Sequence, residues 1–285
     1  MTNRGFALLA VLWLVAALTV LGGLAVGVAR TGSQTTRNRI LLTRAGWARE
    51  ACLEILLARY GQDPTIRHLD SVDLGRGTWC GASVEDPGTK VNLNVADREA
   101  LVAVIAAASH RPAAVVDSLV DALLDWRDAD TVTRPLGFES AANRNGPLAD
   151  VRELRYVRGF DDSLVARLSA LLTTRGAGAI NVNAAPPGVL AILPGIGNEA
   201  IELLMTRRAS RPIPNADFLA GLLSSGARAT LLASYQEFVR AAVFTPPQLV
   251  AVVTGGVRGT PIAARVMLTL VPVPGRLAVI RRETE

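Results

Sequence analysis

The longest pattern in the chain is an apolar run over residues 6–29, FALLAVLWLVAALTVLGGLAVGVA, which contains no charged residue. At about 1.5 Å per residue, a helix of this length crosses the ~30 Å apolar core of a bilayer. Helical spacing of small and apolar residues then continues through Leu41, Ala45, Ala48, Cys52 and Ile55, and no proline precedes Pro64. The pattern predicts one long helix over residues 6–60. Its membrane-spanning part is residues 6–29, and Gly22-Gly23 is a soft point.

Shorter β patterns follow this helix and return at the end of the chain. Residues 77–84 predict a strand, and Glu85-Asp86-Pro87-Gly88 predicts a turn, because proline presets its φ and glycine tolerates positive φ. Residues 90–93 are expected to begin the return strand. Further strands are expected over residues 249–254, 263–271 and 277–281, after the helix-breaking Pro246-Pro247. The first and last strands therefore predict one antiparallel β domain.

The residues between these strands, about 94–240, are predicted to be helical and to contain two diverged units. Each unit opens on an Asn-x-Asn strand end, at residues 91–94 and 180–183, where asparagine can cap exposed N–H groups. Each also has a glycine turn, at residues 157–161 and 193–197. Helices over residues 162–172 and 198–208 are expected to follow these turns.

The second glycine turn, Leu193-Pro194-Gly195-Ile196-Gly197, resembles a helix-hairpin-helix. In nucleic-acid-binding versions, such a loop offers backbone N–H groups to a phosphate. That resemblance implies an alternative function, a membrane-anchored DNA-binding protein of the competence type. Glu199 argues against it, because a carboxylate at this place repels phosphate, and Arg207 and Arg208 lie about two turns away. The structural interpretation is that the glycines form a tight helix–helix joint.

Composition and residue content argue against two classes of function, nucleic-acid binding through a basic tail and enzyme activity. The chain has 285 residues, is 50% hydrophobic and carries a net charge of +5 that is spread without a basic block, so a nucleic-acid tail is not indicated. His68 and His110 stand without a nucleophile motif, and no phosphate-binding glycine loop occurs, so no enzyme activity is predicted. Cys52 and Cys80 lack zinc-site spacing; they form either one disulfide or two unrelated buried thiols.

The start of the chain, Arg4-Gly5-Phe6 in front of the apolar run, resembles a type IV prepilin or pseudopilin cleavage site. The resemblance implies that a prepilin peptidase cuts between Gly5 and Phe6 and that Phe6 becomes N-methylated. The fifth mature residue, usually glutamate in pilins, is Ala10. A subunit without this carboxylate cannot neutralise the terminal amine of a neighbour inside an apolar bundle, so Ala10 suits an end position in a fibre.

Residues 123–154, LLDWRDADTVTRPLGFESAANRNGPLADVREL, resemble the K-type minor pseudopilins of type II secretion systems. The resemblance implies an α+β fold with a pilin-like helix, an antiparallel sheet and an all-α insertion of helix-hairpin-helix or SAM-like units. It also implies a role at the pseudopilus tip in assembly and in export across the outer membrane, with I-type and J-type minor pseudopilins as partners. The expected domains are a leader (1–5), the long helix (6–60), β segments (61–93 and 241–285) and the helical insertion (94–240).

Some K-type members bind calcium in this region, and calcium takes several oxygen ligands from a flexible loop. The ligand set that the resemblance implies here is Asp125, Asp128, Asp130, Glu139 and Asn143. Ser140-Ala141-Ala142 departs from the acidic family pattern and leaves fewer ligands. The alternative is a capped loop in which Asp128 and Asp130 bind nearby backbone N–H groups.

The resemblance implies a single-pass protein of the inner membrane with its body in the periplasm. One pattern points the other way. Arg30, Arg37, Arg39 and Arg44 follow the apolar run, whereas Arg4 and the amino terminus precede it. The positive-inside rule alone would therefore place the body in the cytoplasm.

Overall fold

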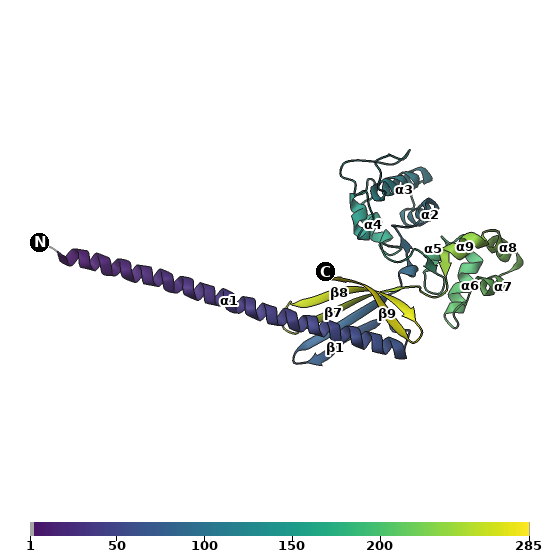
Figure 1. The fold of residues 1–285 in the computed structure, drawn as a ribbon. Coiled ribbons are helices and arrows are strands. Elements are labelled where there is room, and N and C mark those ends of the chain that lie inside the picture. The colour runs from purple at the N-terminus through teal and green to yellow at the C-terminus, as the bar shows by residue number, and fades with distance from the viewer. Residues whose placement is uncertain (1–2, 285) are drawn as a thin grey trace. The chain divides into compact units, whose positions relative to one another are not determined.

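The computed structural model describes the backbone of residues 3–284 and the side chains of residues 11–283 (Figure 1). Its first element is α1, Asn3–Gln62, one continuous helix that passes through Gly22-Gly23 without interruption. The predicted long helix is therefore present. Gly5, Phe6 and Ala10 fall in its first turns, but their side chains lie outside the described residues.

The second half of α1 packs on a sheet through the stripe that the spacing predicts. Ala45, Ala48 and Cys52 are buried, while Leu41 and Ile55 are half-buried at its margin. The contact with the sheet is close: a Cβ added to Gly255 would lie 2.2 Å from the backbone nitrogen of Arg49 and 2.4 Å from the carbonyl oxygen of Ala45. The helix backbone therefore lies directly on the strand that carries Gly255.

The sheet has five strands in the order β1-β2-β7-β8-β9. Their bounds are β1 His68–Gly75, β2 Thr78–Glu85, β7 Leu249–Val257, β8 Ala263–Val273 and β9 Arg276–Thr284. The three C-terminal strands are those predicted. In β8, Val266, Leu268 and Leu270 are fully buried and the residues between them are half-buried, so one face of this strand points to the core.

The predicted N-terminal hairpin is wrong in its pairing. β2 pairs in antiparallel fashion with β1, which precedes it, and not with residues 90–93. After β2, Pro87–Thr89 form a 3-10 turn capped by Asp86, and Val91–Asn92 form β3, which pairs in parallel with β4, Leu172–Thr173. The turn residues were recognised, but a 3-10 turn redirects the chain instead of reversing it into a hairpin.

The helical region comprises α2 Arg98–Ser109, α3 Ala113–Arg127, α4 Asp162–Leu168, α5 Pro187–Leu190, α6 Asn198–Arg208, α7 Ala216–Leu222, α8 Ser225–Ala233 and α9 Tyr235–Ala241, with a 3-10 helix at Val151–Tyr156. One hydrophobic cluster extends through it from Val91 to Ala242. The helix expected over residues 162–172 ends at Leu168, because Leu172 enters β4. By compactness the chain forms two units. One contains α1, β1, most of β2 and Val252–Met267; the other contains Val84–Ala251 and Leu268–Arg282.

The helical region is built from two equivalent halves, as the sequence predicts. The first is framed by the parallel pair β3 and β4, and the second by the parallel pair of β5, Ile180–Asn181, and β6, Ala242–Val243. In the first half, the Asn94 side chain binds the backbone of Leu148 through both its oxygen and its nitrogen. In the second, Asn183 binds Ile213 in the same way.

Two arginines occupy equivalent places in these halves. Arg127, at the end of α3, donates to the carbonyl oxygens of Leu93 and Ala96, which follow β3. Arg208, at the end of α6, donates to those of Val182 and Ala185, which follow β5.

The Asn-x-Asn openings cap backbone N–H groups, as expected: Asn92 accepts from the N–H of Asn94, and Asn181 accepts from that of Asn183. These N–H groups do not belong to the helices that follow. The asparagines of the openings hold the returning chain of each half, and the N-cap of α2 is Asp97.

Asp161 starts α4 and gives a direct test of the first half. Its carboxylate accepts hydrogen bonds from the Ser163 hydroxyl and the Leu164 N–H and pairs with Arg111. These contacts lower the pKa of Asp161 to about 2. Because this folded-state pKa lies below the ordinary aspartate value of 3.8, the carboxylate stabilises the fold above pH 4 and loses this effect as the pH falls toward 2.

We expect Asp161→Ala to lower Tm by a few degrees at pH 7 and by less at pH 2.5, because the wild type has lost part of the same contribution there. Asp161→Asn keeps the cap acceptor and removes only the charge, so it is the matched control. Its Tm at pH 7 should lie between that of the wild type and that of Asp161→Ala. Thermal unfolding followed by circular dichroism at both pH values measures this. Equal losses for Asp161→Ala at the two values would contradict the assignment.

Candidate functional site

The outer surface of α1 is the first candidate site. An 18-residue window within Val11–Gln62 has a mean hydropathy of 2.4 and no buried residue, so this helix is long and apolar enough to cross a membrane. Beyond the apolar run, Ile40, Leu42 and Trp47 are also exposed. Helical spacing places Ile40 and Trp47 on the side away from the buried stripe, whereas Leu42, three residues before Ala45, lies on the same face as the stripe. Trp47 is 72% exposed. A large aromatic side chain in this position is suited to contact with another helix.

The second candidate is an acidic loop, residues 128–147, which joins α3 to Leu148. The equivalent connection in the second half of the helical region is only residues 209–212, between Arg208 and Ile213. Both halves fold around the same asparagine and arginine contacts, so the fold does not require the longer loop. The additional residues of the acidic loop are therefore candidates for a functional role beyond connecting α3 to Leu148.

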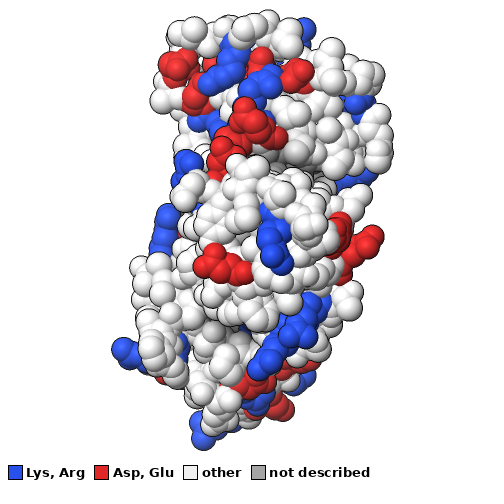
Figure 2. All heavy atoms as spheres, turned by 90° about the vertical axis from the view of Figure 1, so that its right-hand side faces the viewer, with Lys and Arg blue, Asp and Glu red and all other residues white. Residues whose placement is uncertain are grey.

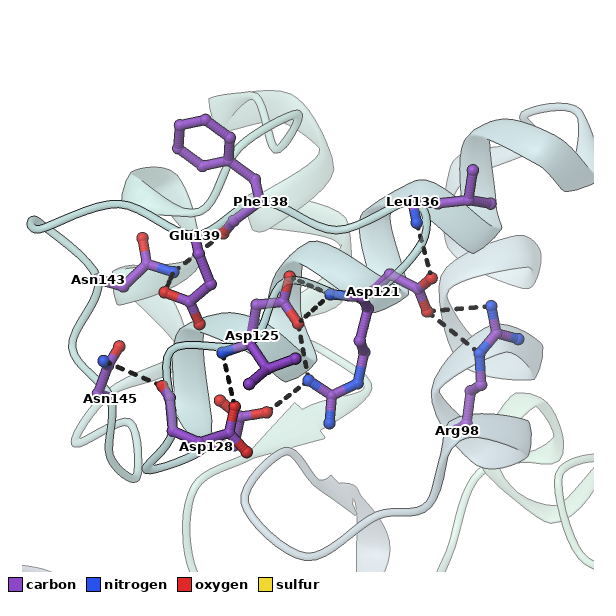
Figure 3. Close-up of polar contacts among 12 residues, drawn as sticks. Arg98, Asp121, Asp125, Asp128, Leu136, Phe138, Glu139, Asn143 and Asn145 are labelled. Atoms are coloured by element: carbon purple, nitrogen blue, oxygen red, sulfur yellow. Dashed lines mark hydrogen bonds and ion pairs between the residues drawn. The ribbon is translucent and has the colours of Figure 1, made fainter.

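Asp125 lies at the base of this loop and is fully buried (Figure 3). The guanidinium of Arg134 lies 2.7 Å from Asp125 Oδ1 and also pairs with Asp128. Gly137 closes over the carboxylate, since a Cβ there would lie 1.9 Å from Asp125 Oδ2. The loop thus folds back on α3 and brings its own cation to the buried carboxylate, which offsets the cost of burying that charge.

Three buried oxygens of this loop have no hydrogen-bond partner: Asp128 Oδ1, Glu139 Oε1 and Asn145 Oδ1. Burial, together with the charges of Asp125, Asp128 and Asp130, raises the pKa of Glu139. Three carboxylates therefore act on Glu139, and Arg134 pairs with two of them, Asp125 and Asp128. Unpartnered acceptor oxygens with excess negative charge are the donor set that a hard cation prefers.

The five ligands expected from the sequence have different roles in the structure. Asp125 is held by Arg134, and Asp130 accepts from the N–H of Val132, as the capped-loop alternative expects for that residue. Asn143 donates to Glu139 Oε2, and its own oxygen accepts from Ser140. Asp128 and Glu139 each keep one free oxygen. Across the part of the chain that the structure describes, no three His, Cys, Asp or Glu side chains converge as a formed metal site.

Sequence reasoning missed Arg134 and Asn145. Arg134 precedes Pro135 within residues 123–154. The excess of carboxylates near it in the sequence was the signal for its role as their counter-ion. Asn145 has a left-handed backbone (φ 48°), and its N–H binds the carbonyl oxygen of Trp126, which turns its side chain toward the loop. Asparagine is among the residues that most readily adopt this conformation.

The glycine turn at residues 193–197 is a helix–helix joint, as the structural interpretation holds. Gly195 has φ +71°, and a Cβ there would lie 2.9 Å from the Cα of Leu231 in α8. Glu199 accepts hydrogen bonds from the N–H and hydroxyl of Ser224, the N-cap of α8. Arg208 is turned toward the carbonyl oxygens of Val182 and Ala185 and not toward solvent.

The charge on the face drawn in Figure 2 gives no support to DNA binding either. Figure 2 shows a face on which Lys and Arg side chains alternate with Asp and Glu and form no continuous basic surface. A duplex binder is expected to gather positive charge along one face.

Comparison with known proteins agrees with the resemblance drawn from residues 123–154. Residues 88–176 match the family model described as type II secretion system, protein K. A solved structure, the GspK-GspI-GspJ complex from the enterotoxigenic Escherichia coli type 2 secretion system, contains a chain with the same fold. The match has a TM-score of 0.57 and 19% identity, and it covers 90% of this chain and 99% of that chain. No curated protein sequence matches this chain.

Proposed function

We propose that this chain, whose residues 88–176 match the protein K family of the type II secretion system, is a minor pseudopilin at the tip of the pseudopilus. The observation that carries the proposal is the combination in one chain of the family's helical domain with a pilin-like α+β frame. The chain acts by assembly and not by catalysis. It helps to start the pseudopilus and so to export proteins across the outer membrane.

The partners that we propose are I-type and J-type minor pseudopilins, because the structurally similar chain was solved as a GspK-GspI-GspJ complex. The α1 surface supplies the contact: its apolar side chains pack against partner helices, as amphipathic helices do in other assemblies. Ala10 in place of glutamate makes this subunit unsuited to a repeating position in the fibre, where each amine needs a neighbouring carboxylate.

We further propose that residues 6–29 anchor the chain in the inner membrane and that the body lies in the periplasm. The membrane-spanning character of α1 supports the anchor. The arginines after the apolar run oppose this orientation, but a pseudopilus subunit has to be assembled from the periplasmic side. Protease added to spheroplasts should therefore digest the body while the cytoplasm stays sealed; protection of the body would contradict the orientation.

Trp47 tests the assembly surface. Because it is largely exposed on the side of α1 away from the sheet, Trp47→Ala should leave Tm within about 2 °C of the wild type. We expect capture of I-type and J-type partners to fall at least tenfold, since exposed tryptophans in interfaces often carry more than 1.4 kcal/mol. Co-purification from detergent-solubilised membranes measures this.

The control for Trp47→Ala is Leu232→Ala, which removes an exposed apolar side chain from α8 in the helical region. It should leave partner capture unchanged. Equal capture by the wild type and by Trp47→Ala would show that this part of α1 is not the assembly surface.

The acidic loop supports a second proposal, the binding of calcium. The residues present fit this ion in kind: Asp128, Glu139 and Asn145 each offer an unpartnered buried oxygen. When bound, calcium would neutralise the excess charge of the loop. Asp125 is not assigned as a ligand, because its carboxylate accepts a hydrogen bond from the Arg134 guanidinium, and this contact holds the loop against α3.

We expect 1 mM calcium to raise Tm by several degrees over a chelator-treated sample, because a ligand that binds only the folded state stabilises it. Glu139→Gln should abolish most of this shift. Asp70→Asn, which changes an exposed carboxylate of β1, is the control and should keep it. Unfolding curves and binding calorimetry provide the two readouts. If calcium produces no heat of binding and no shift in Tm, the calcium proposal is wrong, and the charge of the loop carboxylates is neutralised within the protein by Arg134.

A further inference from the structure

The chain has two cysteines, and the fold brings both of them to the same place. Cys52 lies on α1 and Cys80 on β2, and residues 53–79 separate them in sequence. Both are fully buried free thiols, and burial together with the neighbouring Cys80 raises the pKa of the Cys52 thiol. The structure therefore contains two free, buried thiols that are neighbours, one on the helix and one on the sheet.

The surroundings of the pair follow from the packing of α1 on the sheet. Cys52 continues the buried stripe of Ala45 and Ala48, which lies against Gly255 of β7. β7 is the neighbour of β2 in the sheet, and Cys80 occupies a buried position of the alternating pattern of β2. Both cysteines therefore lie in the buried layer between the helix and the sheet.

We propose that Cys52 and Cys80 form a disulfide that fastens α1 to the sheet. This inference rests on the proposed function, because a periplasmic body folds in an oxidising compartment. The disulfide would hold the two elements of the pilin-like frame together when partner helices pull on α1 during assembly. Residues 53–79 and the helix–sheet contact would then form one closed loop.

The chemistry requires an oxidant, which we identify as the disulfide of a thiol–disulfide oxidoreductase. The two thiols give up two protons and two electrons as the S–S bond forms, and the oxidant's disulfide is reduced to two thiols. The exchange passes through a mixed disulfide, so a sulfur must be reachable by the oxidant. Because both sulfurs are fully buried in the folded unit, the bond has to form before α1 is closed onto the sheet.

The test traps thiols in the full-length protein from membranes of its own host. Membranes are dissolved in denaturant with N-ethylmaleimide and without reductant, and peptides containing Cys52 and Cys80 are analysed by mass spectrometry. We expect neither cysteine to be alkylated, a linked peptide pair to be found, and both to be labelled after reduction. Quantitative labelling of both cysteines in the unreduced sample would overturn the proposal.

A variant set gives a second, independent readout. Cys52→Ala and Cys80→Ala alone should each lower Tm about as far as the double variant, by roughly 6–12 °C, because either one removes the cross-link. Reduction should lower Tm of the wild type only. If the two single effects add and reduction changes nothing, the disulfide is absent.

Failure of this inference can be told apart from failure of the proposed function. If both cysteines are labelled without reduction but protease still digests the body from the periplasmic side, the disulfide proposal fails and the pseudopilin assignment stands. A body that protease cannot reach would contradict the proposed orientation first.

Discussion

Replacing Gly255 with alanine is expected to destabilise the pilin-like frame by more than about 3 kcal/mol. A Cβ at this position would lie 2.2 Å, 2.4 Å and 2.8 Å from the backbone of Arg49, Ala45 and Ala48. Backbone atoms of a helix cannot turn away as a flexible side chain does. The whole of α1 would therefore have to move off β7, and the buried stripe would lose its packing.

Thermal unfolding of the detergent-solubilised full chain measures the effect of Gly255→Ala as a loss of about 6 °C or more. Gly46→Ala is the matched control, because it changes a glycine of α1 where an added Cβ meets no atom within 4 Å. In a helix interior this change should be neutral or stabilising by up to about 1 kcal/mol. Similar Tm values for Gly255→Ala and the wild type would show that α1 does not pack on β7 as described.

Replacing Gly5 with valine is expected to block processing and to abolish secretion, the largest functional effect that we predict. The resemblance to prepilins places the cleavage between Gly5 and Phe6. The peptidase must bind the backbone at Gly5 closely, and the branched side chain of valine would prevent this. An uncleaved subunit keeps residues 1–5 and cannot present an N-methylated Phe6. Immunoblots should show only the longer form, and secreted proteins should accumulate in the periplasm.

The control for Gly5→Val is Gly27→Val, which places the same side chain in the apolar run, at a site where an added Cβ meets no atom within 4 Å. Its processing should be normal. Normal cleavage of Gly5→Val would contradict the prepilin assignment, whatever its effect on secretion.

The long helix was the most predictable part of the fold, since it depends on local signals. Helical spacing, an unbroken apolar run and the lack of proline before Pro64 are all readable in the sequence, and α1 ends close to where they end. β1 left no such signal. Its Asp70, Ser71 and Asp73 face outward from an edge strand with irregular register, so its pattern resembles that of a loop.

Pairing between distant segments was less predictable than the segments themselves. Val91–Asn92 was recognised as extended, but its partner in the sheet is Leu172–Thr173, far along the chain. Nothing in the sequence near Val91 identifies that partner. The two Asn-x-Asn openings were recognised as related, yet their shared task depends on Leu148 and Ile213, which reach them only after folding.

The acidic loop shows the same limit at the candidate site. The family resemblance, together with the residue types in the loop, implied the ligands Asp125, Asp128, Asp130, Glu139 and Asn143. In the structure, Asp128, Glu139 and Asn145 each keep an unpartnered buried oxygen, Asp125 pairs with Arg134, and Asn143 contacts Glu139 and Ser140. Which carboxylate receives the guanidinium depends on how the loop folds back over Gly137, and this is a tertiary contact.

The central claim, that this chain is a processed minor pseudopilin, is tested most directly by the mass of its N-terminal peptide. The peptide should be isolated from cells with and without the prepilin peptidase. We predict a peptide that starts at N-methylated Phe6 when the peptidase is present, and at Met1 or Thr2 when it is absent. A peptide that retains residues up to Gly5 in both strains would contradict the claim and leave an ordinary membrane-anchored protein.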